Sequence, residues 1–287
     1  MLWMLLSACV ATKDEVKEEK ISSMMSLSFP AYFLSQSLLP DIENNCFLPQ
    51  GEDAQHWFPN PDQISGLQNN DLIVQMGSGY EAWVVTASLP SKKLLSLDKG
   101  LSTIPLTGQT HSHGSGGEHE HTGVNPFTWL DPDLYQEQLT ILKDKLISFP
   151  VIDKDQTEKR YSALRTEISD LSASLQLHKG KMSAFQIAAD SQSFAYLARA
   201  LELEIKTFDF PEEEDFITKH LQEFMEWYVP EQKTLMLWSY EPSATLMGKF
   251  PSEIQHLHID TLVQPVQNRS YQYVEQFSQN IKRISEL

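Results

Sequence analysis

The stretch KDQTEKRYSALRTEISDLSASLQLH, residues 154–178, decides the fold that the sequence predicts. Its apolar residues recur at spacings of three and four, which is the periodicity of one face of an α-helix. These residues are Tyr161, Leu164, Ile168, Leu171 and Leu175. At about 1.5 Å per residue the helix would be roughly 37 Å long. We therefore expect it to run the length of a two-lobed protein and to link the lobes.

Short apolar runs alternate with helix-like segments on both sides of this helix. Strands that alternate with helical segments predict βαβ units and a parallel sheet. The predicted fold is α/β, with two similar lobes joined by the long helix, each lobe a mainly parallel sheet flanked by helices. We expect the N-terminal lobe at residues 26–153, the linking helix at 154–178 and the C-terminal lobe at 179–287.

The composition excludes one large class of partners. The chain has 287 residues, of which 41% are hydrophobic, and this is enough for one large globular unit or two lobes. Its 39 acidic and 22 basic residues give a net charge of −17. Nucleic-acid partners need clustered Lys and Arg, and no such cluster occurs, so we expect no nucleic-acid partner. An acidic surface is compatible with a cation ligand and also with solubility alone.

The first nine residues, MLWMLLSAC, form a short apolar run that ends at Cys9. The ending LSAC resembles the lipobox, where a bacterial signal peptide is cut and the cysteine is lipidated. Residues 10–25 are polar and charged, as expected of a tether. We expect a lipoprotein of the periplasm or cell surface, with a lipid anchor to the membrane at Cys9. Basic residues are missing before the apolar run, so an upstream start and an accidental resemblance are the alternatives.

A His-rich loop at residues 107–124 is the strongest metal-binding pattern in the chain. It is rich in Gly, lacks periodicity, and contains four of the nine histidines. Imidazole pairs with interleaved carboxylates can wrap around a borderline cation such as Zn²⁺ and release it easily. The candidate ligands are His111, His113, Glu118, His119, Glu120 and His121. The alternative is a solvated polar loop without a ligand.

Three separated motifs resemble those of the cluster A-I substrate-binding lipoproteins of zinc and manganese ABC transporters. PQGEDAQHWFPNP at residues 49–61 is similar to P-P-G-x-D-P-H-x-[WY]-E-P-T-P. NDLIVQMGSGYEAW at residues 70–83 is similar to A-D-L-v-x-x-N-G-x-x-x-E-x-W. NPFTWLDP at residues 125–132 follows the His-rich loop, as D-P-H-x-W-L-[DS]-P does in zinc-binding members. The agreement in order and spacing covers nearly the whole chain after residue 26.

The resemblance implies what the protein does and where it would bind. Family members hold a metal between their lobes through imidazoles and carboxylates and pass it to the membrane permease of an ABC transporter. The positions that match three family imidazoles carry Gln55, Phe127 and Ser191 in this sequence, while Asp260 matches the family Asp. The implied deep metal site is therefore largely dismantled.

A slipped metal site would use His56, Asp190 and Asp260, because adjacent loop residues can exchange roles after small backbone shifts. Against it, adjacent residues on a strand point to opposite sides, and His56 also fits a solvent-facing loop residue. A tight zinc site needs about four ligands of suitable type that face the same point. The sequence leaves the slipped site and a lost site as alternatives.

Two functions from different classes follow. The first is a monomeric, lipid-anchored solute-binding protein of a metal uptake system, with zinc as the cation because imidazoles favour a borderline ion over hard manganese. The second is a paralogue that has kept the fold and lost the deep metal site, with a structural, adhesive or regulatory role, or with an organic solute bound against Phe127 and Trp57. No nucleophile elbow, P-loop or dinucleotide fingerprint occurs, so we expect no enzyme.

Overall fold

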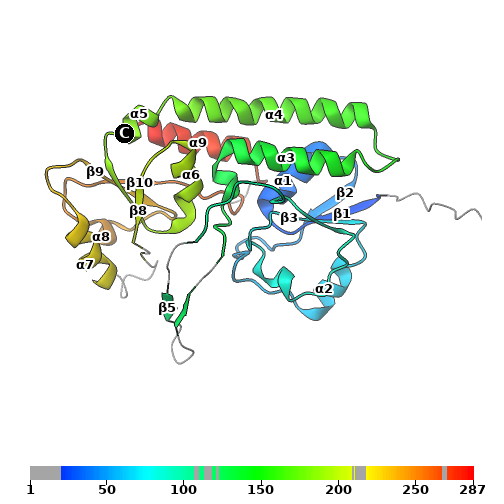
Figure 1. Cartoon of the computed structure of the whole chain (residues 1–287), viewed down its shortest axis with the longest axis horizontal. Coiled ribbons are helices and arrows are strands. Elements are labelled where there is room, and N and C mark those ends of the chain that lie inside the picture. Colours follow the sequence, from blue (N-terminus) through cyan, green and yellow to red (C-terminus); the bar gives the residue numbers. More distant parts are fainter. Residues whose placement is uncertain are drawn as a thin grey trace, which may run out of the picture.

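The chain folds into two lobes, each built on a four-stranded parallel sheet (Figure 1). This confirms the predicted fold class. The computed structural model describes residues 21–106, 110–112, 118–120, 123–208, 210, 218–266 and 270–287.

The N-terminal sheet has the strand order β2-β1-β3-β4, and every pair in it is parallel. The strands are β1 (Ser23–Ser26), β2 (Glu43–Cys46), β3 (Leu72–Gln75) and β4 (Leu94–Ser96). The helical segments are α1 (Phe29–Leu38), α2 (Pro61–Leu67) and the 3-10 helix η1 (Ala82–Val85). Parallel neighbours need long crossover connections, which explains the alternation of strand and helix in the sequence.

The C-terminal sheet has the order β10-β9-β7-β8, which repeats the topology of the first sheet. The strands are β7 (Gln186–Ala189), β8 (Ile205–Thr207), β9 (Thr234–Trp238) and β10 (Gln255–His258). The helical segments are η4 (Gln192–Phe194), α6 (Ala195–Ala200), α7 (Thr218–Trp227) and α8 (Ala244–Met247). In both sheets the first strand lies between the second and the third, so each lobe has a topological switch point beside its first strand.

The long helix predicted at residues 154–178 is α4 (Lys154–Gln176). Asp153 caps it by accepting a hydrogen bond from the Gln156 N–H, and all five apolar residues of the predicted face are buried. α4 contacts α1, α3 (Pro132–Leu146) and α9 (Tyr273–Ser285). It runs along most of the long axis of the molecule, above both sheets (Figure 1). One continuous hydrophobic core contains side chains from both lobes, so the lobes are packed against each other.

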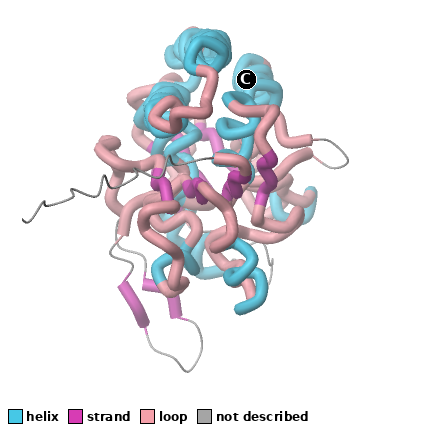
Figure 2. The backbone as a smooth tube through the Cα atoms, turned by 90° about the vertical axis from the view of Figure 1, so that its right-hand side faces the viewer, coloured by secondary structure: helices cyan, strands magenta, loops and turns pink. Residues whose placement is uncertain are grey.

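The lobes have a layered cross-section. Viewed along the long axis, the strands form a middle layer with helices above and below it (Figure 2). The remaining elements are η3 (Thr128–Leu130), α5 (Lys179–Met182) and the short strands β5 (Thr110–Ser112) and β6 (Glu118–Glu120). None of the helices that the structure describes is long and apolar enough to cross a membrane.

The boundary expected between tether and lobe is wrong by several residues. β1 begins at Ser23, and Ile21 and Met24 are buried, so residues 21–25 belong to the folded body. The polar serines made this segment resemble a tether. β1 nevertheless pairs with β2 on one side and β3 on the other, and its serine hydroxyls have partners: Ser23 Oγ accepts from Asp71 N and Ser26 Oγ donates to Asn44 Oδ1. Cys9 and the rest of residues 1–20 lie outside the described part of the chain.

Candidate functional site between the lobes

The loops that follow the strands of the two sheets meet between the lobes. Asn125 Nδ2 of the N-terminal lobe donates to the Gln192 carbonyl oxygen after β7, at 2.7 Å. Trp129 Nε1 donates to the Thr261 carbonyl oxygen after β10, at 2.8 Å, and this contact is buried. In open α/β sheets ligands bind outside the carboxyl ends of the strands, at the switch point. This region is therefore the candidate functional site.

A buried carboxylate occupies the switch point of the C-terminal lobe. Asp190 directly follows β7 and is 1% exposed. Its Oδ2 accepts hydrogen bonds from Ser239 N at 2.8 Å and Ser239 Oγ at 2.6 Å, while Oδ1 has no hydrogen-bond partner. Burial raises the pKa of Asp190 to about 6, against the opposing effect of the hydrogen bonds from Ser239. The carboxylate thus connects the ends of β7 and β9.

A second buried carboxylate, Glu81, occupies the matching place in the N-terminal lobe. It is 3% exposed and accepts hydrogen bonds from Ser28 Oγ at 2.6 Å, Met76 N at 3.1 Å and Gly77 N at 3.3 Å. Burial raises its pKa. Gly77 has a φ of 87°, and a Cβ there would lie 2.3 Å from Asp98 Cγ, so only glycine fits. No role for Glu81 follows from the sequence, because Glu81 comes after the third strand of its lobe whereas Asp190 comes after the first.

The loop after β2 turns His56 toward solvent. The His56 side chain is 83% exposed, and its Nδ1 pairs with Asp53 Oδ2. The next residue, Trp57, packs its ring 5.4 Å from that of Phe47 and 6.4 Å from that of Trp83. The Trp57 side chain packs inward against these rings, and the side chain of its neighbour His56 points to solvent. Gln55 is half-buried, and its backbone N–H donates to Asp53 Oδ1 at 3.0 Å.

Phe127 belongs to an aromatic cluster between the lobes. Its ring centroid lies 5.4 Å from that of Trp129 and 6.1 Å from that of Tyr80. The rings of Tyr80 and Trp129 are 4.6 Å apart, and the Tyr80 hydroxyl is buried without a hydrogen-bond partner. Where the family resemblance implies an imidazole, this chain has apolar packing.

Ser191 and Asp260 have local structural roles. Ser191 Oγ accepts a hydrogen bond from the Ser193 N–H at the start of η4. Asp260 Oδ1 accepts from Leu262 N at 2.8 Å, and Oδ2 accepts from Gln276 Nε2 at 3.2 Å. Leu262 has a φ of 59°, a conformation that is uncommon for residues other than glycine. The Asp260 carboxylate therefore supports a strained turn and joins it to α9.

The structure does not bring the three residues of the slipped metal site together. Across the part of the chain that the structure describes, no three His, Cys, Asp or Glu side chains gather into a group that could hold a metal ion. The physical reason is that the three expected ligands are each engaged elsewhere. His56 pairs with Asp53, Asp190 accepts from Ser239, and Asp260 accepts from Leu262 and Gln276.

The His-rich loop forms a short antiparallel pair of strands. β5 and β6 pair with His111 directly opposite His119 in the backbone register. The pair lies apart from both sheets (Figure 1). His113 and His121 lie outside the described residues.

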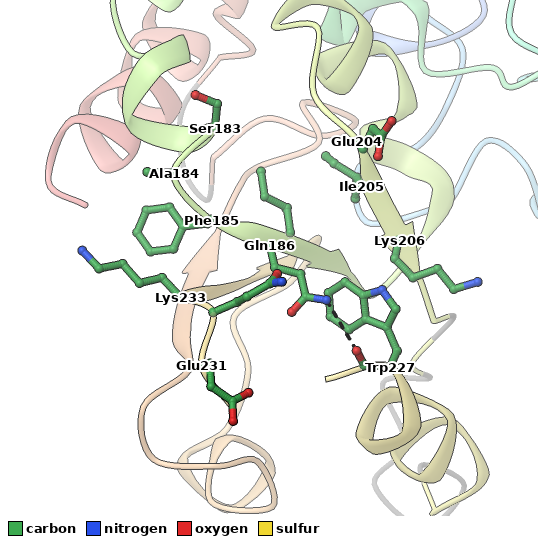
Figure 3. A pocket seen from close by; sticks show the side chains of 12 residues that line it. Ser183, Ala184, Phe185, Gln186, Glu204, Ile205, Lys206, Trp227, Glu231 and Lys233 are labelled. Atoms are coloured by element: carbon green, nitrogen blue, oxygen red, sulfur yellow. Dashed lines mark hydrogen bonds between the residues drawn. The ribbon is translucent and has the colours of Figure 1, made fainter. Parts of the chain in front are cut away.

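A hollow of about 810 Å³ lies at the other end of the C-terminal sheet (Figure 3). Gln186 and Ile205, which begin β7 and β8, line it together with Phe185, Trp227 and Lys233. Gln186 Nε2 donates to the Trp227 carbonyl oxygen at 3.4 Å. Because it lies at the amino ends of the strands, this hollow is separate from the region between the lobes.

Comparison with known proteins identifies relatives with the same architecture. The family model described as zinc-uptake complex component A, periplasmic, matches residues 26–287. The high-affinity zinc uptake system protein ZnuA of Bacillus subtilis (strain 168) is 22% identical over 211 residues, and the match covers 69% of this chain and 65% of that protein. The chain thus spans slightly less than two thirds of this relative.

Solved structures share the fold at low sequence identity. The metal-dependent lipoprotein YcdH of Bacillus subtilis superposes with a TM-score of 0.78 at 17% identity, covering 93% of this chain and 98% of that one. The Zn(II)-bound ZnuA-like domain of Streptococcus pneumoniae AdcA has a TM-score of 0.75 at 15% identity, with coverage of 93% and 98%. FpvC of Pseudomonas aeruginosa in complex with Mn²⁺ has a TM-score of 0.73 at 17% identity, with coverage of 93% and 99%. The family model matches residues 26–287, which include both lobes and the long helix. The chain therefore belongs to the ZnuA family of periplasmic zinc-uptake components, as its motifs predicted.

Proposed function

We propose that this protein is the extracytoplasmic, lipid-anchored solute-binding subunit of an ABC uptake system for zinc, and that it passes the cation to a membrane permease. The family match over residues 26–287 carries the proposal. It is supported by the two lobes of identical strand order and by the fold shared with a Zn(II)-bound domain. The LSAC sequence ending at Cys9 supports the lipid anchor. In this function the protein binds and releases a cation and makes no covalent bond.

We infer that zinc is captured by the His-rich loop, through His111, His113, His119 and His121. Imidazoles are good ligands for Zn²⁺, and the backbone register places two of these residues opposite each other. Ordering the loop costs roughly 1–2 kcal/mol per residue fixed, so the affinity should be modest and release easy.

Calorimetric titration with ZnCl₂ should locate the site. The intact chain should bind zinc, and deletion of residues 107–124 should weaken binding at least tenfold, because the imidazoles are removed. A matched variant with the loop retained and its four histidines changed to glutamine should lose zinc equally. If all three proteins bound zinc with equal affinity, the binding site would lie in the lobes and not in the His-rich loop. No heat with any of them would contradict zinc transport.

The binding should weaken in acid. A histidine ligand must be neutral, and imidazole ordinarily titrates near pH 6.5. Below this pH protons compete with zinc, so the Kd should rise at least tenfold between pH 7.5 and pH 5.5. The same titration at four pH values measures this. A Kd that stays constant over the range would exclude imidazole ligands.

A paralogue without metal transport is the second candidate function. The observation that favours it is that Gln55, Phe127 and Ser191 replace the imidazoles implied by the family and that the residues the structure describes form no three-ligand group. Such a protein would use the same lobes in a structural, adhesive or regulatory role. Absence of zinc binding in the titration above would favour this candidate.

A further inference from the structure

The side chain of Gln264 connects the two lobes. It lies on the loop after β10, and both polar atoms of its amide bind the loop after β2. Its Oε1 accepts from Gly51 N at 3.1 Å, and its Nε2 donates to the Glu52 carbonyl oxygen at 2.6 Å. These bonds reach the loop that carries Gln55 and His56. One amide therefore joins the two loops that, by the family resemblance, would carry the first and last metal ligands.

The Gln264 amide is held on a well-supported loop. The Gln264 carbonyl oxygen accepts from Gln276 Nε2 at 3.0 Å. The same nitrogen donates to Asp260 Oδ2 at 3.2 Å, and Gln276 is only 4% exposed within α9. Gly51 has a φ of 89°, a region that favours glycine, and no side chain at this position competes with Gln264 for its N–H. Both partners are thus preorganised for the contact.

We propose that Gln264 is an interlobe clasp, which holds the loop at residues 49–58 against the C-terminal lobe by direct hydrogen bonds. The carboxylate of Asp260 is already occupied by Leu262 and Gln276. The clasp is solvent-accessible, whereas the Trp129 contact with Thr261 is buried, so the lobes are joined both inside and at the surface. The clasp consists of protein groups alone, so we expect it to hold the loop at residues 49–58 without a bound metal ion. The inference goes beyond the proposed function and stands whether or not the His-rich loop binds zinc.

Hydrogen–deuterium exchange of the full chain in EDTA tests the clasp. In Gln264→Met the side chain keeps its length and loses both hydrogen bonds to the loop. Amides of residues 49–58 should then exchange roughly tenfold faster than in the wild-type protein. Gln264→Glu keeps an acceptor for Gly51 but sets its second carboxylate oxygen against the Glu52 carbonyl oxygen, so it should also accelerate the exchange of this loop. Gln279→Met changes an exposed glutamine of α9 and should alter nothing in this loop.

Three results would overturn the proposal. The first is equal exchange of residues 49–58 in wild type and Gln264→Met. The second is slowing of this exchange by more than tenfold when ZnCl₂ is added to the wild type, because the metal would then close the lobes. The third result concerns Gln264→Glu. It applies if Gln264→Met also speeds amide exchange in the strands β3 and β9, which would indicate general unfolding of that variant. Gln264→Glu then decides, and unchanged loop exchange in that variant contradicts the clasp.

Discussion

Replacing Trp129 with alanine should lower the free energy of unfolding by about 3–5 kcal/mol, the usual cost of truncating a large buried aromatic side chain. Trp129 is fully buried, and its ring contacts those of Tyr80 and Phe127. Its Nε1 also makes the buried hydrogen bond to Thr261 across the lobes. The substitution would remove the ring packing and leave the Thr261 carbonyl oxygen without this donor. Urea denaturation followed by circular dichroism measures the loss.

Two further variants separate the contributions at Trp129. Trp129→Phe keeps most of the ring and removes the indole N–H, so about 1–3 kcal/mol of the loss should remain. Phe58→Ala truncates an aromatic ring that is 64% exposed and should change stability by no more than about 0.5 kcal/mol. A loss below about 1 kcal/mol in Trp129→Ala would show that the lobes do not depend on this contact.

Replacing Asp190 with asparagine should stabilise the protein at pH 8. Burial raises the pKa of this carboxyl from 3.8 to about 6, so above pH 6 the folded chain must hold a buried charge that water solvates in the unfolded chain. The favourable contribution of the neutral carboxyl is fully present below pH 4 and is lost as the pH rises through 6. An amide carries no charge, so the variant should gain up to about 3 kcal/mol at pH 8 and nothing at pH 4.

Denaturation of both proteins at several pH values between 4 and 8 measures this gain. Ser239 can still donate to the amide oxygen of the variant, so the connection between β7 and β9 is retained. Glu231→Gln, at an exposed position, is the control and should change stability by no more than about 0.5 kcal/mol. A destabilised Asp190→Asn protein at pH 8 would show that the charge-assisted hydrogen bonds outweigh desolvation. If Asp190→Asn also lost zinc binding, Asp190 would be identified as a metal ligand.

Elements with a long periodic pattern could be predicted from the sequence. The helix α4 was identified by five apolar residues on one face, and all five are buried against the other helices and the core. The alternation of strand and helix likewise predicted two parallel sheets. The start of β1 was misplaced because a four-residue strand, SMMS, is too short for its alternation to stand out among polar residues.

The candidate site was predicted far less well, because ligand geometry depends on the direction of single side chains. His56, Asp190 and Asp260 have the residue types of metal ligands, and the sequence could not show that Asp53, Ser239 and Gln276 engage them. Gln264 carries no signal at all in the sequence. Its two bonds are to backbone atoms more than two hundred residues away.

By itself, the sequence determined the family, the two α/β lobes and the long helix, because periodicity and motif order are local properties of the chain. It also showed that Phe127 stands where an imidazole is implied. Only the tertiary structure decided that Asp190 and Glu81 are buried at the two switch points and that Gln264 joins the lobes. The physical reason is that burial and hydrogen-bond partners are set by segments distant in sequence, whose approach no local pattern encodes.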